Sequence, residues 1–164
     1  MDTSVAIRHY EPRDLARLQS ITAQTFGPVS IDRNMEERLG PFGDGDWSTR
    51  KLAAIADDCR LQPDGVFVAV DPASGDVIGY VTTRVNATSR IGWIPNLAVD
   101  PAHQGKGLGR ALLEHALAFF RQQGMQVAKI ETLDQNPIGQ TLYPSLGFRE
   151  VARQIHYALR LDRP

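Results

Sequence analysis

The stretch from Asn96 to Arg110 constrains the fold of this chain more than any other. It passes from an apolar strand end, Leu97 to Val99, through Asp100-Pro101 into a glycine-rich turn and then a periodic helix of Leu and Ala. The first four N–H groups of a helix lack carbonyl partners, and the aligned peptide dipoles place partial positive charge there. A strand, a glycine turn and a helix start in this order therefore predict a site for a phosphate group.

The glycines of the turn suit such a site. Gly105, Gly107 and Gly109 permit positive φ and carry no Cβ atom that would hold a pyrophosphate away from the backbone amides. The alternative interpretation is a glycine-rich turn that only begins a helix.

Two common phosphate motifs fail at defined positions. A Walker loop needs a Gly four intervening residues before the Gly-Lys pair and a Ser or Thr after it, where this chain has Asp100 and Gly107. A dinucleotide fingerprint that began at Gly105 would need glycine at position 110, which is Arg110. Neither motif explains the turn.

The pattern that fits is Gln-x-x-Gly-x-Gly, formed by Gln104, Gly107 and Gly109. In it the sequence resembles the GCN5-related N-acetyltransferase (GNAT) superfamily, whose acetyl-CoA pyrophosphate loop has this pattern. The stretch 136–148 is similar to the superfamily's second signature, an Asn followed by a Leu-Tyr pair and Leu-Gly-Phe. Two motifs at the expected separation carry the resemblance.

The resemblance implies an α/β (α+β) fold. It predicts a single GNAT-like domain over residues 1–164, with a mixed central sheet of about six to seven strands flanked by about four helices. The fourth strand is expected to be bulged and to splay from the fifth, which leaves backbone groups of Leu97, Ala98 and Val99 free for the pantetheine arm. Pro95 agrees with this expectation, because proline removes a ladder donor and is avoided in central strands except at bulges or open edges.

Periodicity and turn signals predict the other elements. Helices are expected near Glu11, near Asp32–Leu39, from Arg50 after a Trp47-Ser48-Thr49 cap, over 108–123, and after an Asn136 cap. Strands are expected at Ser4–His9, Val66–Val70, Val77–Val85, Gly92–Val99 and Met125–Leu133, followed by a final hairpin from Phe148.

Composition limits the partners and the compartment. At 164 residues, with 42% apolar and 23% charged residues, the chain suits one globular domain. A net charge of −1 argues against nucleic acid, and no apolar run approaches the ~20 residues that cross a membrane. We see no signal peptide, and a single cysteine, Cys59, suits a reducing cytoplasm.

Metal and serine-hydrolase chemistry are not indicated. The four histidines lack short ligand spacings and the single cysteine adds none, so no metal site is expected. No Gly-x-Ser-x-Gly elbow occurs either.

Attack of an amine on an acetyl thioester needs a neutral amine, a stabilised oxyanion and a proton for the departing thiolate. Deprotonating a lysine amine at pH 7 costs roughly 4 to 5 kcal/mol, against about 1 for an α-amine. By resemblance, Tyr143 matches the tyrosine that often protonates the sulfur of CoA, and the Leu97–Val99 amides are the expected oxyanion donors. A core tyrosine is the alternative. Pro144 departs from the family pattern and is expected to disturb the helix at Tyr143.

Glu131 is the candidate base. It precedes Tyr143 by twelve residues, which is similar to ribosomal-protein alanine acetyltransferases, where the matching glutamate acts as base. An exposed strand carboxylate is an equal alternative, since a glutamate with a pKa near 4.3 is a weak base unless burial raises that pKa or water relays the proton.

The resemblance also assigns the cosubstrate, acetyl-CoA, with no metal. Its pyrophosphate is expected on the backbone amides of Gln104, Gly105, Lys106, Gly107, Leu108 and Gly109. Lys106 and Arg110 are expected near the adenosine phosphates, or else as solvated charges, and Asn136 near the pantetheine.

The sequence therefore predicts an acetyl-CoA-dependent N-acetyltransferase that acetylates a primary amine by direct attack in a ternary complex. A catalytically silent CoA-binding regulatory module is the alternative. The acceptor is an amine-bearing small molecule or a peptide or protein N-terminus, met by residues 26–47 and 149–157. A homodimer is left open.

Overall fold

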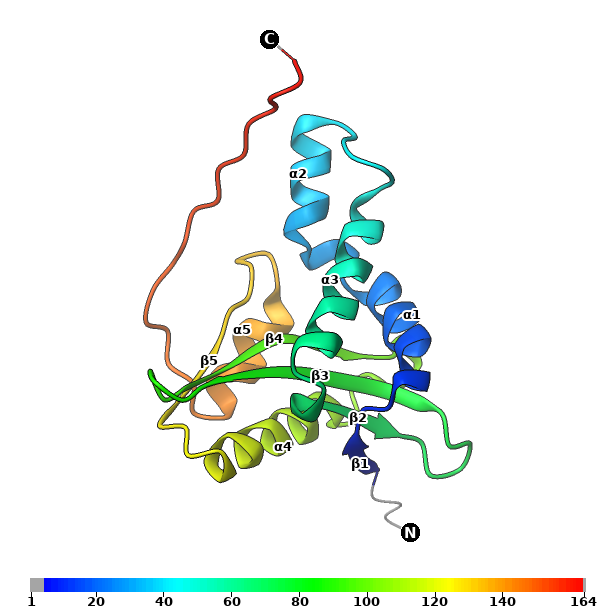
Figure 1. The fold of residues 1–164 in the computed structure, drawn as a ribbon, viewed down its shortest axis with the longest axis vertical. Helices are drawn as coiled ribbons and strands as arrows, with labels where there is room; N and C mark the ends of the chain where they lie inside the picture. Colours follow the sequence, from blue (N-terminus) through cyan, green and yellow to red (C-terminus); the bar gives the residue numbers. More distant parts are fainter. Residues whose placement is uncertain (1–4, 164) are drawn as a thin grey trace.

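The computed structural model describes residues 5–163, which build one mixed five-stranded sheet with helices on both faces (Figure 1). The strands follow the order β1-β2-β3-β4-β5, antiparallel except for the parallel pair β4 and β5. Their bounds are β1 Ala6–His9, β2 Val66–Val70, β3 Val77–Asn86, β4 Ile91–Val99 and β5 Val127–Ile130. Ser4, expected in the first strand, lies outside the described residues.

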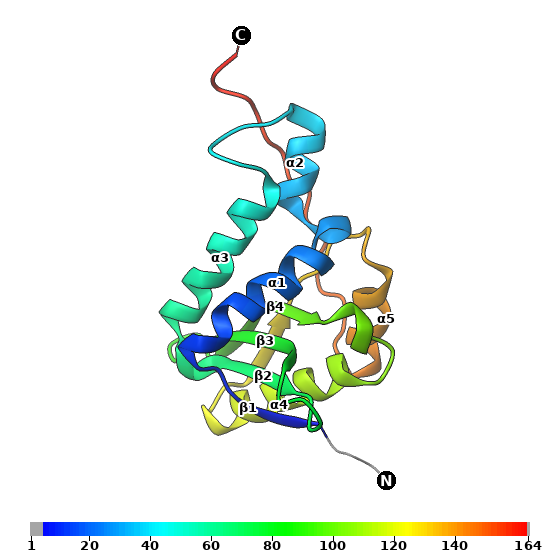
Figure 2. The ribbon, with the colours of Figure 1, turned by 90° about the vertical axis from the view of Figure 1, so that its right-hand side faces the viewer.

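The helices divide between the two faces of the sheet. They are α1 Leu15–Thr25, α2 Ile31–Leu39, α3 Trp47–Leu61, α4 Leu108–Gln122 and α5 Pro137–Ser145. Figure 2 shows α1 and α3 on one face and α4 on the other. Each face has its own apolar core, around Leu18, Ile55 and Tyr80 beneath α1 and α3, and around Phe67, Leu112 and Phe120 beneath α4.

Helix boundaries follow local capping chemistry. α3 begins at Trp47, three residues earlier than expected, because the Asp46 carboxylate accepts hydrogen bonds from the amides of Ser48 and Thr49, at 2.9 and 3.2 Å. The expected Trp47-Ser48-Thr49 cap is therefore wrong. None of the helices in residues 5–163 is long and apolar enough to cross a bilayer.

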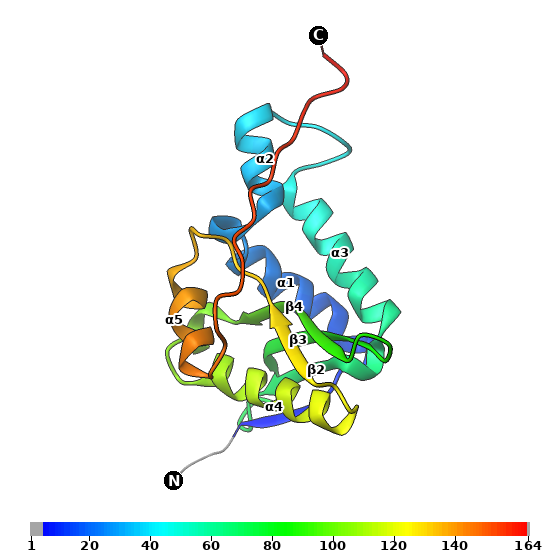
Figure 3. The ribbon, with the colours of Figure 1, turned by 90° about the vertical axis from the view of Figure 1, so that its left-hand side faces the viewer.

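The expected number of elements is wrong as well. Residues 5–163 contain five strands and five α-helices, instead of about six to seven strands and four helices. The missing strands are those of the final hairpin, since residues 149–163 contain no strand and run as an extended segment along the side of the molecule (Figure 3). Alternating apolar residues specify an extended backbone but not the strand that pairs with it.

The sheet opens between β4 and β5. β4 pairs with β5 only from Ile91 to Ile94, whereas it pairs with β3 as far as Val99. The β3–β4 register shifts between Thr82 and Arg84, opposite Pro95, which is the bulge that the proline indicates. Residues 95–99 of β4 therefore have no strand on the β5 side.

Candidate active site

The turn after β4 is fixed at its start by Asp100. One carboxylate oxygen accepts a hydrogen bond from the Ala102 amide at 2.8 Å, and the other forms an ion pair with Arg17 of α1. The Asp100 amide donates to the Ile78 carbonyl of β3 at 2.8 Å. Partial burial opposes ionisation of the Asp100 carboxyl. The hydrogen bonds from the Ala102 amide and from Arg17 nevertheless hold its pKa below the usual value. The entry into the glycine turn is thus anchored to β3 and α1.

The turn itself leaves the start of α4 open. Gly105 and Gly107 have φ of +76° and +81°, and a Cβ at either position would meet no atom within 4 Å. Gly107 is the N-cap residue of α4, and no side chain caps the helix. Gly109 differs, since it lies inside α4 and a Cβ there would be 3.5 Å from Leu142 of α5. Free amides beside open space fit the pyrophosphate of acetyl-CoA.

The open edge of β4 leads to this turn. The Asp100 amide bonds to β3, and backbone groups alternate sides along a strand, so the Ala98 backbone also faces β3. The groups of Leu97 and Val99 therefore face the open side. The Val99 carbonyl there accepts a hydrogen bond from the Gln104 side chain at 3.1 Å. Of the three residues expected as oxyanion donors, Leu97 and Val99 therefore have backbone groups on the open side, whereas those of Ala98 face β3.

The two cations of the turn are placed differently. Lys106 is exposed, and its ammonium lies 3.4 Å from the Ala102 carbonyl. Arg110 donates to the Ser145 hydroxyl at 2.6 Å and lies 3.7 Å from Glu114. Arg110 therefore joins α4 to α5, whereas Lys106 is available to a bound phosphate.

Tyr143 lies on α5, against the core beneath α4. Its ring meets the Phe148 ring edge-on at 6.2 Å between centroids. Burial raises the pKa of the Tyr143 phenol above its ordinary value, which keeps it protonated at neutral pH. Pro144 disturbs little, because α5 ends one residue later at Ser145 and the Tyr143 carbonyl accepts hydrogen bonds from the Leu146 and Phe148 amides.

Asn136 caps α5 as expected. Its side-chain oxygen accepts a hydrogen bond from the Gly139 amide at 3.3 Å, and its nitrogen donates to the Thr132 hydroxyl at 2.8 Å. Pro137 follows at the first helical position. The cap fixes the start of the helix that carries Tyr143.

Glu131 follows β5 directly, and both of its oxygens are engaged. One accepts a hydrogen bond from the Trp93 indole at 2.5 Å, and the other lies 3.0 Å from the Lys129 ammonium. Its side chain is 53% exposed. These contacts hold the carboxylate beside the point where β4 and β5 separate. To accept a proton from an amine, the carboxylate would have to give up a contact with Trp93 or Lys129.

Sequence reasoning missed a buried polar network on the α3 side of β4. Asn96 donates to Asp58 of α3 at 2.7 Å and to Thr82 at 2.9 Å, and it accepts from Lys51 at 2.7 Å. Asp58 also pairs with Arg84 of β3. Burial lowers the pKa of the Lys51 ammonium. An asparagine inside the apolar run Ile94-Pro95-Asn96-Leu97 was the available signal.

A polar cavity of about 280 Å³ lies between α2 and the segment after β5. It is lined by Gly27, Pro28, Arg33, Asn34, Glu37 and Gln135. The Asn34 and Gln135 side chains bond to each other at 2.8 Å, so they join two segments that are far apart in the sequence. No group of three metal-ligating side chains occurs within residues 5–163.

The fold and the site define a class of protein, namely a mixed-sheet α/β protein whose sheet opens beside an uncapped helix start. The chain belongs to the acetyltransferase (GNAT) family, whose model matches residues 31–148. The expected family is confirmed. The family is one of acetyltransferases, which agrees with the acyltransferase class expected from the sequence.

Individual relatives agree with the family. The mycothiol acetyltransferase of Salinispora tropica is 34% identical over 119 residues, which cover 70% of this chain and 38% of that protein. The chain thus spans well under half the length of this curated relative. Ard1 of Thermoplasma volcanium has a similar fold, with a TM-score of 0.68, 23% identity and coverage of 92% and 86%. The protein yncA of Salmonella typhimurium, solved with acetyl-CoA, has a TM-score of 0.68, 25% identity and coverage of 98% and 88%.

Proposed function

We propose that this protein is an acetyl-CoA-dependent N-acetyltransferase that transfers the acetyl group to a primary amine by direct attack in a ternary complex. The observation that carries the proposal is the continuous path from the open edge of β4 to the uncapped start of α4. Gly105 and Gly107 leave space at its end, and Tyr143 lies on the neighbouring helix α5. A thioester laid along this path would have its phosphates and its acyl group bound by different parts of one surface.

In this proposal, different residues bind different parts of acetyl-CoA. Backbone amides between Gln104 and Gly109 would hold the pyrophosphate, with the Lys106 ammonium beside the adenosine phosphates. The open groups of Leu97 and Val99 would pair with the pantetheine and donate to the carbonyl oxygen as negative charge develops on it. In this proposal Asn136 orients α5 through its cap.

Bound acetyl-CoA supplies the activated acyl group and a thiolate leaving group. Tyr143 would give its phenolic proton to that sulfur, and its raised pKa keeps the proton in place at neutral pH. Glu131 would take a proton from the amine, directly or through water, after yielding one of its two contacts. An acceptor whose amine has a low pKa would need less assistance from a base, because more of it is neutral at pH 7.

The acceptor proposed here is an amine-bearing small molecule. The curated relatives are named mycothiol acetyltransferase. The polar cavity beside α2 is lined by the ion pair of Arg33 with Glu37, at 2.9 Å, and by the amides of Asn34 and Gln135. These groups suit a hydroxyl-rich or zwitterionic amine better than an apolar one.

Turnover with a panel of amines tests the proposal. Acetyl-CoA is supplied with amino sugars, polyamines, aminoglycosides, amino acids and short peptides, and acetylated product is detected by mass spectrometry while CoA binding is followed by calorimetry. We expect at least one polar small amine to be acetylated and Tyr143→Phe to slow it. Tight CoA binding without acetylation of any amine would instead favour the silent CoA-binding module.

A further inference from the structure

Lys51 of α3 carries a positive charge that no neighbouring carboxylate neutralises. Within residues 5–163 it is the only partly buried lysine or arginine that forms no ion pair. The others, which each pair with an acidic side chain, are Arg8, Arg17, Arg33, Arg50, Arg84 and Arg160. Ionised side chains inside proteins are normally paired, because an unpaired charge loses hydration without compensation. A cation in this state indicates a site for an anion.

The contacts of the Lys51 ammonium favour its charged form and leave it able to bind a ligand. Its only hydrogen-bond acceptor in residues 5–163 is the Asn96 side-chain oxygen, at 2.7 Å, and its nitrogen lies 4.3 Å from the centroid of the Phe26 ring. An amide oxygen and an aromatic face both stabilise an ammonium. Because an ammonium has three N–H groups, donors remain for a further acceptor.

The polar network around Asn96 has an excess of one positive charge. Asp58 is its only carboxylate, whereas Lys51 and Arg84 are both cations. One Asp58 oxygen pairs with Arg84 and the other accepts from the Asn96 amide at 2.7 Å. Reversing that amide would place its NH₂ group against the Lys51 ammonium and its oxygen against the Asp58 carboxylate, so its orientation is fixed. Asp58 is therefore not free to pair with Lys51.

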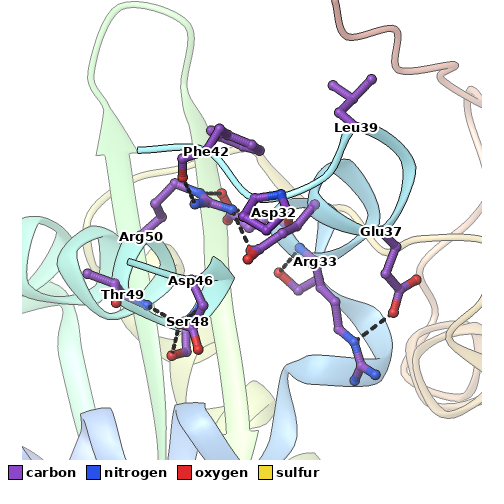
Figure 4. Close-up of polar contacts among 12 residues, drawn as sticks. Asp32, Arg33, Glu37, Leu39, Phe42, Asp46, Ser48, Thr49 and Arg50 are labelled. Atoms are coloured by element: carbon purple, nitrogen blue, oxygen red, sulfur yellow. Dashed lines mark hydrogen bonds and ion pairs between the residues drawn. The ribbon is translucent and has the colours of Figure 1, made fainter. Parts of the chain in front are cut away.

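The nearby carboxylates of α2 are not available to Lys51 either. Asp32 and Glu36 lie 3.4 and 2.9 Å from the guanidinium of Arg50, the residue before Lys51 (Figure 4). The same guanidinium donates to the Phe42 carbonyl at 3.1 Å and lies 4.0 Å from the centroid of the Phe42 ring. These contacts hold α2 against α3 and engage the negative charge on this side of α2.

Lys51 lies between the polar cavity and the open edge of β4. Trp47, one helical turn before it, faces Gly27 of the cavity wall, where a Cβ would be 3.3 Å from the indole ring. On the other side Lys51 bonds to Asn96, and the next residue, Leu97, has its backbone groups on the open side. An acceptor that enters through the cavity would thus pass the ammonium before its amine reaches the thioester.

We propose that Lys51 binds a carboxylate of the acceptor, so that the substrate is an amino acid or a similar zwitterion. This inference rests on the proposed N-acetyltransferase function. The carboxylate supplies the missing negative charge, and a charge-assisted hydrogen bond orients the acceptor. Asn96 and Phe26 are positioning residues that hold the ammonium. Because Asn96 directly precedes Leu97, and consecutive Cα atoms are about 3.8 Å apart, the amine and the carboxylate are expected to lie only a few bonds apart.

Acceptors that differ only at the carboxylate test this role. Each of a panel of L-amino acids is compared with its carboxamide, and kcat/KM is measured for the wild type and for Lys51→Met. The amine pKa differs between acid and amide, but this difference is common to both proteins and cancels in the cycle. We expect Lys51→Met to reduce the preference for acid over amide by ~10-fold to 100-fold, the usual effect of a hydrogen bond to a charged group. An equal loss for acids and amides would overturn the proposal.

Two further variants control for charge and for folding. Arg121→Met removes the same charge from an exposed position in the last turn of α4 and should keep the wild-type preference. Lys51→Arg retains a cation and should keep a stronger preference for acids than Lys51→Met. Methionine is flexible and close to lysine in length, and it removes a partly buried charge, so we expect Lys51→Met to fold and to bind CoA as the wild type does.

Binding without turnover separates this inference from the proposed function. The wild type and Lys51→Met are titrated with each acid and amide in the presence of CoA, and binding is followed by ligand-observed NMR. At least one acid should bind the wild type more tightly than its amide does, and Lys51→Met should lose the difference. If this holds but no amine is acetylated, the carboxylate site stands and the transferase proposal fails. If amines are acetylated but no acid binds the wild type better than its amide, the carboxylate site is refuted and the transferase proposal stands.

Discussion

Gly107 is the residue at which the fold and the proposed phosphate site meet. Its φ of +81° and the empty space beside it are both needed for a turn that exposes the first amides of α4. Gly107→Val should abolish CoA binding while the protein stays folded, because the new side chain would occupy the space of the pyrophosphate. Calorimetry with CoA measures the affinity.

A control variant separates the effect of backbone strain from the loss of space for the pyrophosphate. Gly75 has a φ of +77° in the β2–β3 turn, and a Cβ at this position would also meet no atom within 4 Å. Gly75→Val therefore introduces similar strain, ~1–2 kcal/mol, far from the proposed site. If both variants keep the wild-type affinity for CoA, the turn does not hold the phosphates.

Tyr143 is the residue whose proposed role is chemical. Tyr143→Phe should lower kcat by ~10²-fold to 10⁴-fold with little change in KM for acetyl-CoA, because a proton needed as the sulfur departs is removed. Burial raises the pKa of this phenol, so activity that depends on its proton should persist to pH values above the usual tyrosine range near 10. Tyr80→Phe, which deletes a buried hydroxyl beneath α1 and α3, is the control. Unchanged single-turnover acetyl transfer by Tyr143→Phe would remove the acid role.

Glu131 can be tested through its partner Trp93. Trp93→Phe removes the indole donor from one carboxylate oxygen and leaves Lys129 on the other. If Glu131 is the base, Glu131→Gln should remove the acidic limb of the kcat/KM profile, whereas Trp93→Phe, which keeps the carboxylate, should retain that limb. The loss in Glu131→Gln should be larger for amines of higher pKa. Unaltered pH profiles would make Glu131 an exposed structural carboxylate.

Among the elements, α3, β3 and β4 are joined by the Asp58 carboxylate. It accepts from Asn96 and pairs with Arg84, and it is only 8% exposed. Asp58→Ala should lower the free energy of unfolding by about 2–3 kcal/mol, because both partners lose their acceptor in a partly buried setting. Urea unfolding with an unchanged m-value would measure this loss.

The ion pair of Asp57 with Arg60 provides the control for Asp58→Ala. Asp57 faces Arg60 at 3.2 Å, and both side chains are more than 60% exposed. Asp57→Ala should therefore cost no more than ~0.5 kcal/mol. Equal losses in the two variants would mean that helix propensity, not the buried network, explains the effect.

How far the sequence predicts each element depends on how local its determinants are. α4 is predictable from its apolar period, the glycine turn before it and Gly124 after it, whose φ is +73°. The contact between Trp93 and Glu131 is not, because it depends on the parallel register that sets Trp93 opposite Lys129. Likewise Asp58 reaches Asn96 only through the packing of α3 on the sheet.

At the scale of the whole molecule, the acceptor side of the proposed site is the part that the sequence predicts least well. Residues 149–157 were expected to meet the acceptor as part of a final hairpin, but residues 149–163 contain no strand. Alternation along a segment specifies an extended backbone, whereas the strand that pairs with it depends on the rest of the sheet.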